Sequence, residues 1–589
     1  MSADQTAPDE TAPDPVQGGP AWWTSAIVYQ IYPRSFADSD GDGVGDLGGI
    51  IGKLDYLAEL GVDVLWLSPV YQSPHYDNGY DISDYRQIDP VFGTLEQFSD
   101  LLAGAHHRGM KLVMDLVVNH TSHEHEWFKE ASSSVTSPKR DWYWWREPRE
   151  GFDAGAPGAE PTNWGAAFSG PAWTLDPHTG QYYLHLFAAQ QPDLNWENPE
   201  VRSAIYDMMN WWLDLGVDGF RMDVINYISK DPTLPDGVVP PGGLWGDGGP
   251  HFISGPRIHD YLQEMHREVF TGRSADLITV GEMPGATVKE ALLFTDPVRR
   301  ELDMIFQFEH VELDYGPGGK WDYRGLNLAD LKTSWTRWQH GLATTGWNSL
   351  YLNNHDQPRL VSRFGDDAGL RYESATLWAT LLHLHRGTPY IYQGEELGMT
   401  NVPFASIEDF SDLESVNYFA EATTVLGMDP EEVLASIRIM SRDNARTPVQ
   451  WSGEAHAGFT TGEPWLSVNP NYLSINAEAD RVAEKSIYSH YQRLIRLRHE
   501  SAAVRLGEFT LLEADHPTLY AFTRSHDGET LTVVGNVSGE KLALPNGLGH
   551  GECLLGNYRD AGAGKSDPGW LRPWEARVLS TSPAVHEFV

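Results

Sequence analysis

Short apolar runs alternate with longer amphipathic stretches along most of the chain. The short runs predict strands at Ile27–Tyr32, Val64–Ser68, Lys111–Val118, Gly219–Asp223, Leu277–Glu282, Asp303–Phe308, Ser349–Asn353 and Pro389–Gln393. The longer stretches predict helices, notably at Leu95–Arg108, Glu200–Leu215, Ile258–Phe270, Leu328–His340, Tyr372–Arg386 and Lys485–His499. Eight strands, each followed by a helical pattern, predict an α/β fold whose parallel sheet closes into a (β/α)8 TIM barrel. An open doubly wound sheet is the alternative, and it is disfavoured because no Gly-rich phosphate loop follows the first strand.

Two connections are too long for ordinary barrel loops. The first, rich in Trp, Gly and Pro, predicts an inserted domain after strand three, and the second is an excursion late in the barrel. The hydrophobic period then changes to two, which predicts a separate antiparallel β domain built as a sandwich. The N-terminal residues are acidic, lack a secretory signal and predict a disordered tail. The predicted organisation is a tail at 1–20, a barrel at 21–120 and 200–506, an inserted domain at 121–199, an excursion at about 394–483 and a C-terminal domain at 507–589.

Composition and charge exclude several classes of partner. The 589 residues hold 42 Lys and Arg against 83 Asp and Glu, a formal charge of −41, so we expect no binding to nucleic acid or to anionic membranes. No apolar run is long enough to span a bilayer. The one cysteine, Cys553, excludes an intramolecular disulfide and a Cys-based metal site, which fits a reducing compartment. We expect a cytoplasmic protein that is a monomer or a small homo-oligomer.

Polar and charged side chains stand where the predicted strands end. In a TIM barrel these ends meet at one rim, where active residues lie. The motifs there are Asp115–His120 after strand three, Arg221-Met222-Asp223 after strand four, Gly281-Glu282 after strand five, Asn353–Asp356 after strand seven and His75–Asp81 beyond strand two. Arg221 and Asp223 share one face of their strand because side chains alternate, and a neighbouring cation favours an ionised carboxylate with a low pKa. The set predicts a site with paired carboxylates for acid, base and nucleophilic chemistry.

These motifs, in this order, resemble those of the α-amylase superfamily, glycoside hydrolase family thirteen, from Trp22 to the end of the chain. Within it the chain resembles the oligo-1,6-glucosidase and α-glucosidase branch, through Gln191–Asn195 and Ser441–Trp451. The resemblance implies an exo-acting retaining α-glucosidase. It would release glucose from the non-reducing end of short α-1,6-linked gluco-oligosaccharides through a covalent glucosyl-enzyme.

The resemblance also implies roles for the three acidic residues. Asp223 would be the nucleophile and Glu282 the general acid and then the general base, about 5 Å apart as in retaining enzymes. Asp356 would hold the sugar hydroxyls and favour the distorted ring. We expect Arg221 to lower the pKa of Asp223, and the two other carboxylates to raise the pKa of Glu282.

Further residues carry over as contacts to the terminal glucose. The implied substrate-binding residues are Asp77, Tyr80, His120, Arg221, Val224, His355 and Arg446. His120 and His355 would donate to hydroxyls, Tyr80 would stack on the sugar, and Asp77 with Arg446 would close the pocket. Val224 directly after the nucleophile resembles enzymes that prefer α-1,6 links, whereas Thr or Ala there resembles those that prefer α-1,4 links. Arg442 is a second candidate for the role of Arg446, although we expect it to form a surface salt bridge instead.

One loop predicts a cation site. After the first strand, carboxylates occur at every second position, a spacing that can wrap oxygens around a hard cation. The family resemblance supports a structural Ca²⁺, or Mg²⁺, with the ligands Asp38, Asp40, Asp42, Val44 and Asp46. We expect no organic cofactor.

Two alternatives stay open at this point, and two others are disfavoured. The same site could transfer glucose to a sugar acceptor, or act on α-1,4 links or sucrose. Sucrose isomerisation is disfavoured because residues Tyr315–Trp321 lack the charged and aromatic loop of those enzymes. A non-catalytic transporter subunit with this fold is disfavoured because Asp223, Glu282 and Asp356 are all present.

Overall fold

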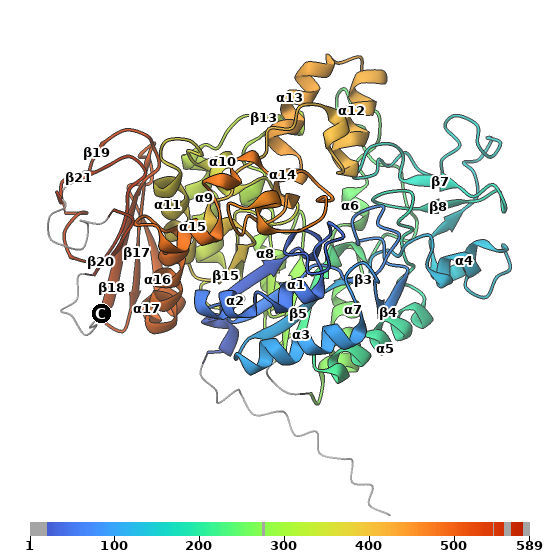
Figure 1. The fold of residues 1–589 in the computed structure, drawn as a ribbon. Helices are drawn as coiled ribbons and strands as arrows, with labels where there is room; N and C mark the ends of the chain where they lie inside the picture. The colour runs from blue at the N-terminus through green and yellow to red at the C-terminus, as the bar shows by residue number, and fades with distance from the viewer. Residues whose placement is uncertain (1–19, 274–276, 546, 559–566, 581–589) are drawn as a thin grey trace, which may run out of the picture.

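A computed structural model describes residues 20–273, 277–545, 547–558 and 567–580 (Figure 1). Its centre is a parallel barrel in the order β11-β10-β9-β5-β2-β1-β15-β14, and a bridge between Ile305 and Asn348 joins the first strand to the last. The strands are β1 (Val28–Ile31), β2 (Val64–Leu67), β5 (Lys111–Val117), β9 (Gly219–Asp223), β10 (Ile278–Glu282), β11 (Met304–Phe306), β14 (Ser349–Leu350) and β15 (Thr388–Tyr392). Each lies in one of the eight predicted runs or within one residue of it, so the predicted TIM barrel is confirmed. Almost all of the predicted tail lies outside the described residues.

A helix follows each strand and covers the barrel from outside (Figure 1). These helices are α2 (Leu54–Leu60), α3 (Leu95–His107), α5 (Pro199–Leu215), α7 (Ile258–Met265), α8 (Val288–Thr295), α9 (Leu328–Gly341), α11 (Arg371–His383) and α16 (Ile487–Glu500). All six predicted helices form, although the last part of one is the π-helix η5 (His266–Phe270) after α7. Side chains start several of them, for example Thr94, which forms a capping box with Gln97 at the start of α3.

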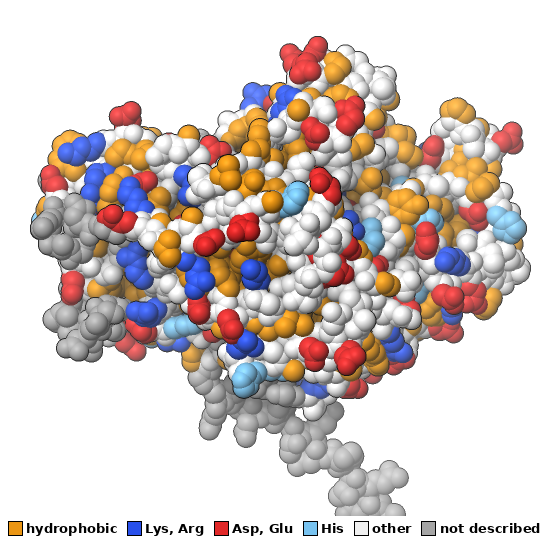
Figure 2. Space-filling view, viewed as in Figure 1, with side chains coloured by type: hydrophobic (Ala, Val, Ile, Leu, Met, Phe, Trp, Pro, Cys, Tyr) orange, Lys and Arg blue, Asp and Glu red, His pale blue; other side chains and the backbone are white. Residues whose placement is uncertain are grey.

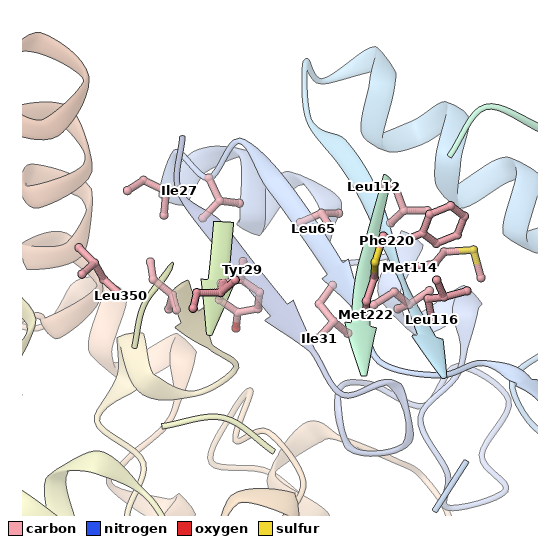
Figure 3. Packing of buried hydrophobic residues seen from close by; sticks show 14 of the residues in the cluster. Ile27, Tyr29, Ile31, Leu65, Leu112, Met114, Leu116, Phe220, Met222 and Leu350 are labelled. Carbon is pink, nitrogen blue, oxygen red and sulfur yellow. The ribbon is translucent and has the colours of Figure 1, made fainter. Parts of the chain in front are cut away.

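Strand alternation separates the barrel wall into two faces. Outward side chains such as Tyr29, Leu65, Leu112 and Phe220 pack under the helices (Figure 3). Their neighbours along the strands point inward and form a second apolar cluster around Trp66. Towards the carboxyl ends of the strands the inward positions become polar, so the period of two brings the predicted charged residues to one rim.

The insertion after β5 has its own small core. It holds α4 (Glu126–Ser132) and a three-stranded antiparallel sheet of β6 (Trp145–Arg146), β8 (Tyr182–Leu184) and β7 (Trp173–Leu175). Trp144, Trp164 and Trp173 are buried within it. In Figure 1 this part projects to the right of the barrel.

The C-terminal region is an antiparallel sheet in the order β16-β17-β18-β22-β20. Its strands are β16 (Glu508–Leu512), β17 (Leu519–His526), β18 (Glu529–Asn536), β20 (Glu552–Gly556) and β22 (Ala576–Ser580). One face, through Tyr520 and Phe522, joins the core of the barrel, and the other packs against the small β19–β21 sheet (Leu542–Ala543, Trp570–Leu571). The predicted antiparallel β domain is therefore confirmed, and it lies to the left of the barrel in Figure 1.

The late excursion holds α12 (Leu413–Thr424), α13 (Pro430–Met440), α14 (Asp443–Arg446) and α15 (Ala477–Val482). The pair α12 and α13 rises above the barrel in Figure 1. Figure 2 shows acidic side chains spread over much of the visible face, as the net charge predicts. No helix of the described residues has the length and hydropathy that a membrane crossing needs.

Candidate active site

A cavity of about 450 Å³ opens at the carboxyl ends of the strands. Loops after β9 and β11, the insertion, and helices of the late excursion build its walls. Its charged and imidazole lining residues are Asp77, His120, Asp223, Asp247, Glu282, Glu312, Lys320, Asp356, Glu414 and Arg442. Aromatic and apolar residues, including Phe168, Phe187 and Phe252, line the rest. A concave site with aromatic walls and converging polar groups suits a small polyhydroxylated ligand.

Arg221 is the centre of the site. It lies beside Asp115 in the register of β5 and β9, and both side chains point into the barrel. Its Nη1 donates to Asp115 Oδ1 and to Asp223 Oδ1, both at 2.7 Å, and its Nη2 forms an ion pair with Glu282. The backbone N–H of Val224 donates to the other oxygen of Glu282 at 3.1 Å. One buried guanidinium therefore fixes the two carboxylates predicted to react.

Burial decides the protonation of this pair. It raises the pKa of Glu282 to about 8, helped by the charges of Asp223 and Asp356 and opposed by Arg221. Burial also raises the pKa of Asp223 above its ordinary value. Arg221 opposes that effect without outweighing it, so the predicted low pKa of Asp223 is wrong in its net direction. The predicted rise for Glu282 is present.

Asp356 lies in a strongly cationic environment. Its Oδ1 accepts from Arg446 Nη2 at 2.7 Å and from Arg442 Nη1 at 3.3 Å, and His355 Nε2 lies 3.2 Å from its Oδ2. Burial disfavours its charge, but His355, which is protonated at the low pH where Asp356 titrates, and the two arginines outweigh burial and lower the pKa of Asp356 well below the usual range. Asp356 is thus an acceptor for hydroxyl groups rather than a proton donor.

The structure corrects the predicted pairing of Asp77. Arg442 Nη2 lies 3.3 Å from Asp77 Oδ1, whereas Arg446 is directed at Asp356 and at the carbonyl of His355, 3.0 Å away. Arg442 is 7% exposed and also pairs with Asp412 at 2.7 Å, so the predicted surface salt bridge is wrong. The sequence held a signal for this, because residues four apart on a helix share a face and both arginines lie in α14 or next to it.

The remaining predicted binding residues surround Asp77 and Asp356. Tyr80 lines the cavity, donates to Asp115 Oδ2 at 2.9 Å and stacks on His355 with ring centroids 5.1 Å apart. His120 Nε2 is 3.1 Å from the carbonyl of Tyr80. Burial lowers the pKa of His120 to about 4 and of His355 to about 3, so both rings are neutral near pH 7.

Val224 lines the cavity with a strained backbone. Its φ is +34°, in the left-handed region that β-branched residues avoid. That conformation turns its N–H towards Glu282 while its side chain, 7% exposed, contributes to the wall. A backbone conformation of this kind persists only when the surrounding structure holds it, and such residues cluster at active sites.

Two supporting groups were not assigned roles from the sequence. Asp115 accepts hydrogen bonds from both Arg221 and Tyr80. The sequence analysis named the motif that begins at Asp115 but predicted no role for this residue. Lys230 is fully buried and donates to Asn119 Oδ1 at 3.0 Å, with Asp193 Oδ2 2.9 Å away. It ties the loop after β9 to β5 and to the end of the insertion. A lysine in a loop shows no sequence signal for such a contact.

Three of the predicted cation ligands come together in the loop after β1. Oxygens of Asp38, Asp40 and Asp42 lie within 4.8 Å of one another. Asp46 differs from the prediction, because its carboxylate caps the helix Leu47–Ile51 through Gly49 N and also accepts from Ser39. Carboxylate oxygens alone are a donor set that fits a hard divalent cation.

If the cavity binds a terminal glucose, as the sequence resemblance implies, replacing Arg442 with methionine should raise the KM for isomaltose about tenfold or more, because Asp77 and Asp356 lose a shared buried cation. Steady-state kinetics and competitive inhibition by glucose measure the effect. Arg496→Met removes an equal charge from an exposed position on α16 and serves as the control. An unchanged glucose inhibition constant in Arg442→Met would contradict this role.

Comparisons with known proteins identify the family of the chain. A family model for the catalytic domain of alpha-amylase matches residues 30–507. The oligo-1,6-glucosidase of Parageobacillus thermoglucosidasius is 55% identical over 561 residues, which cover 95% of this chain and 98% of that protein. The trehalose-6-phosphate hydrolase of Bacillus subtilis is 49% identical and covers 95% of this chain and 98% of its own length. The crystal structure of trehalulose synthase from Pseudomonas mesoacidophila MX-45 matches with a TM-score of 0.88 at 43% identity, covering 96% of this chain and all of that one. The family match and the near full-length identities show that the chain belongs to the alpha-amylase family and is a glycoside hydrolase of the α-glucosidase type.

Proposed function

We propose that the protein is an exo-acting, retaining α-glucosidase that removes glucose from the non-reducing end of short α-1,6-linked gluco-oligosaccharides. The observation that carries the retaining mechanism is the guanidinium of Arg221, which holds Asp223 and Glu282 together. Retaining enzymes place their carboxyl pair about 5 Å apart, whereas inverting enzymes need about 6.5–9.5 Å to fit a water between them. Two carboxylates on one guanidinium match the closer spacing.

The proposed reaction has two steps. Asp223 attacks the anomeric carbon, and the bond to the leaving oxygen breaks as Glu282 donates its proton to that oxygen. In the second step Glu282, now ionised, takes a proton from water, whose oxygen displaces Asp223. A Glu282 pKa of about 8 keeps the acid protonated at neutral pH. Asp356, held ionised by its arginines, accepts hydrogen bonds from the sugar hydroxyls.

The exo mode is supported by the closed end of the cavity. Asp77, Arg442 and Asp356 form a continuous charged contact there, and Gln191 Nε2 adds a bond to Asp77 Oδ2 at 3.1 Å. A glucan chain cannot pass through such a wall, so the terminal glucose is the part that fits. Pocket-shaped sites of this kind release one sugar at a time.

A time course on isomaltose, maltose and sucrose at equal concentration, with products separated by chromatography, tests the proposal. We expect glucose from isomaltose well ahead of glucose from the other two sugars. Faster maltose or sucrose cleavage would overturn the linkage preference. Early appearance of longer oligosaccharides or of sucrose isomers would show transfer in place of hydrolysis.

Replacing Val224 with threonine is expected to lower the ratio of kcat/KM for isomaltose to that for maltose by about tenfold, within the range that small changes to a substrate pocket give. Val224 lines the same cavity as Glu282, and its backbone N–H donates to that carboxylate, so we expect its side chain to lie near the leaving glucose. Val288→Thr, at the start of α8 and outside this cavity, is the control. A ratio that does not move in Val224→Thr means that linkage preference is set elsewhere.

A structural Ca²⁺ or Mg²⁺ in the loop after β1 is also proposed, held by Asp38, Asp40 and Asp42. We expect a chelator to lower the melting temperature by about 2–5 °C, since a bound ion stabilises only the folded state. Asp40→Asn should lose the metal on dialysis and the response to chelator, whereas Asp153→Asn should keep both. Metal-free protein of unchanged melting temperature would refute the site. Cytoplasmic location and oligomeric state stay predictions from the sequence.

A further inference from the structure

Three carboxylates line the cavity in addition to Asp77, Asp223, Glu282 and Asp356. Asp247 comes from the loop after β9 and Glu312 from the segment after β11, whereas Glu414 of α12 lies 3.5 Å from Arg442. All three line the cavity that holds Asp223 and Glu282. Among the described residues, Asp247 and Glu312 form no ion pair with the closed end around Arg442, so they are assigned to the other half of the cavity, called the outer half. In an exo-acting enzyme the outer half receives the leaving group, because the closed end receives the terminal glucose.

The cations of the cavity are already neutralised. Lys320 forms a close ion pair with Glu414. Arg442 pairs with Asp77, Asp356 and Asp412 at the closed end, and also with Glu414 at 3.5 Å. Among the lining residues that the structure describes, these are the two lysine and arginine side chains. An anionic leaving group therefore meets no cation that is free of a carboxylate partner.

Two carboxylates of the outer half stay uncompensated. Asp247 and Glu312 are exposed, and among the described residues neither has an ion-pair partner within 4.0 Å. Asp247 is fixed in place, because its Oδ1 accepts from the N–H of Gly249 at 2.8 Å. Both charges therefore act on whatever occupies the outer half.

We infer that this enzyme discriminates by charge at the leaving group, accepting neutral sugars and rejecting sugars that carry a phosphate or carboxylate there. The inference rests on the proposed exo-acting function and names its substrate class as non-phosphorylated oligosaccharides. Identity alone does not settle this point, since a relative named for trehalose 6-phosphate is 49% identical. Asp247 and Glu312 are the specificity-determining residues, by repulsion rather than by attraction.

A matched pair of aryl α-glucosides tests the inference. The 4-carbamoylphenyl and 4-carboxyphenyl glucosides have similar shape and differ by one charge at neutral pH. At low ionic strength we expect kcat/KM to be about tenfold or more higher for the neutral compound, an effect that two carboxylates across a wet cavity can supply. Added salt should shrink the ratio, because exposed charges are screened beyond about 10 Å at 0.1 M.

Neutralising substitutions locate the effect. Glu312→Gln and Asp247→Asn should each cut the neutral-to-anionic ratio about threefold, by removing one repulsive charge. Glu508→Gln changes the net charge equally on the exposed β16 and should leave the ratio unchanged. Asn at 247 keeps an acceptor for Gly249, so its fold should survive, which a melting curve checks.

The outcomes separate this inference from the proposed function. Equal kcat/KM for both aryl glucosides in the unmodified enzyme, or an unchanged ratio in both variants, would overturn the charge discrimination while leaving isomaltose cleavage intact. Cleavage of the aryl pair with the expected ratio but without isomaltose cleavage would overturn the linkage proposal alone. Efficient turnover of trehalose 6-phosphate, compared with trehalose, would also refute the inference.

Discussion

Replacing Asp223 with alanine is expected to lower kcat for isomaltose by about 10⁴-fold or more, because the covalent step loses its nucleophile. The carboxylate of Asp223 lies at the end of β9, and Arg221 donates to its Oδ1. Asp223 is the only acidic residue of this strand, so no neighbour in β9 can replace it as nucleophile. Alanine leaves Arg221 bound to Asp115 and Glu282, so the site keeps its architecture. Steady-state kinetics measure the loss, and Asp207→Ala, exposed on α5, is the control.

Azide distinguishes loss of the nucleophile from loss of the fold. In Asp223→Ala a small anion can enter the vacated space and attack an activated α-glucosyl fluoride from the face that Asp223 occupied. The product is then β-glucosyl azide, with inverted configuration. Recovery of activity with that product supports the assignment. Undiminished isomaltose hydrolysis in Asp223→Ala, without azide, would falsify it.

The barrel could be predicted from the sequence because its signal is local. Each strand is a short buried run, and β9 occurs over the residues predicted for it. The rule that active residues gather at the carboxyl ends of barrel strands then placed Asp223, Glu282 and Asp356 on one rim. The structure brings these three to the same cavity, with the predicted Tyr80 and His120 beside them.

The partners of the arginines were less predictable, because they depend on segments far apart in the chain. Asp77 and Arg442 are separated by 365 positions and meet only because the late excursion folds back over the rim. Periodicity carries no information on such a contact. The predicted direction of the pKa shift of Asp223 was wrong for a related reason. The sequence shows that Arg221 is near Asp223, but it does not show how completely the fold removes both side chains from water.

Replacing Glu282 with alanine is expected to lower kcat/KM for isomaltose by about 10²–10⁴-fold, the usual contribution of a general acid. The loss should be much smaller for 2,4-dinitrophenyl α-glucoside, because its leaving group departs without a proton. Glu508→Ala, on the exposed β16, should affect neither substrate. Azide should speed turnover of the activated substrate in Glu282→Ala and give α-glucosyl azide, since Asp223 still forms the intermediate and azide needs no general base.

The pH dependence of activity tests the roles of Glu282 as acid and Asp223 as nucleophile. Glu282 must be protonated to donate, so activity of the unmodified enzyme should fall as the pH rises through about 8, where burial and the charges of Asp223 and Asp356 place its pKa. Asp223 must be ionised to attack, so activity should also fall on the acidic side, at a pH raised by its own burial. In Glu282→Ala, assayed on the activated substrate, the alkaline fall should vanish while the acidic fall remains. An alkaline fall near pH 8 that persists in this variant would assign the proton donor to another group. Because the two limbs report two different carboxylates, losing one and keeping the other separates the acid from the nucleophile in one measurement.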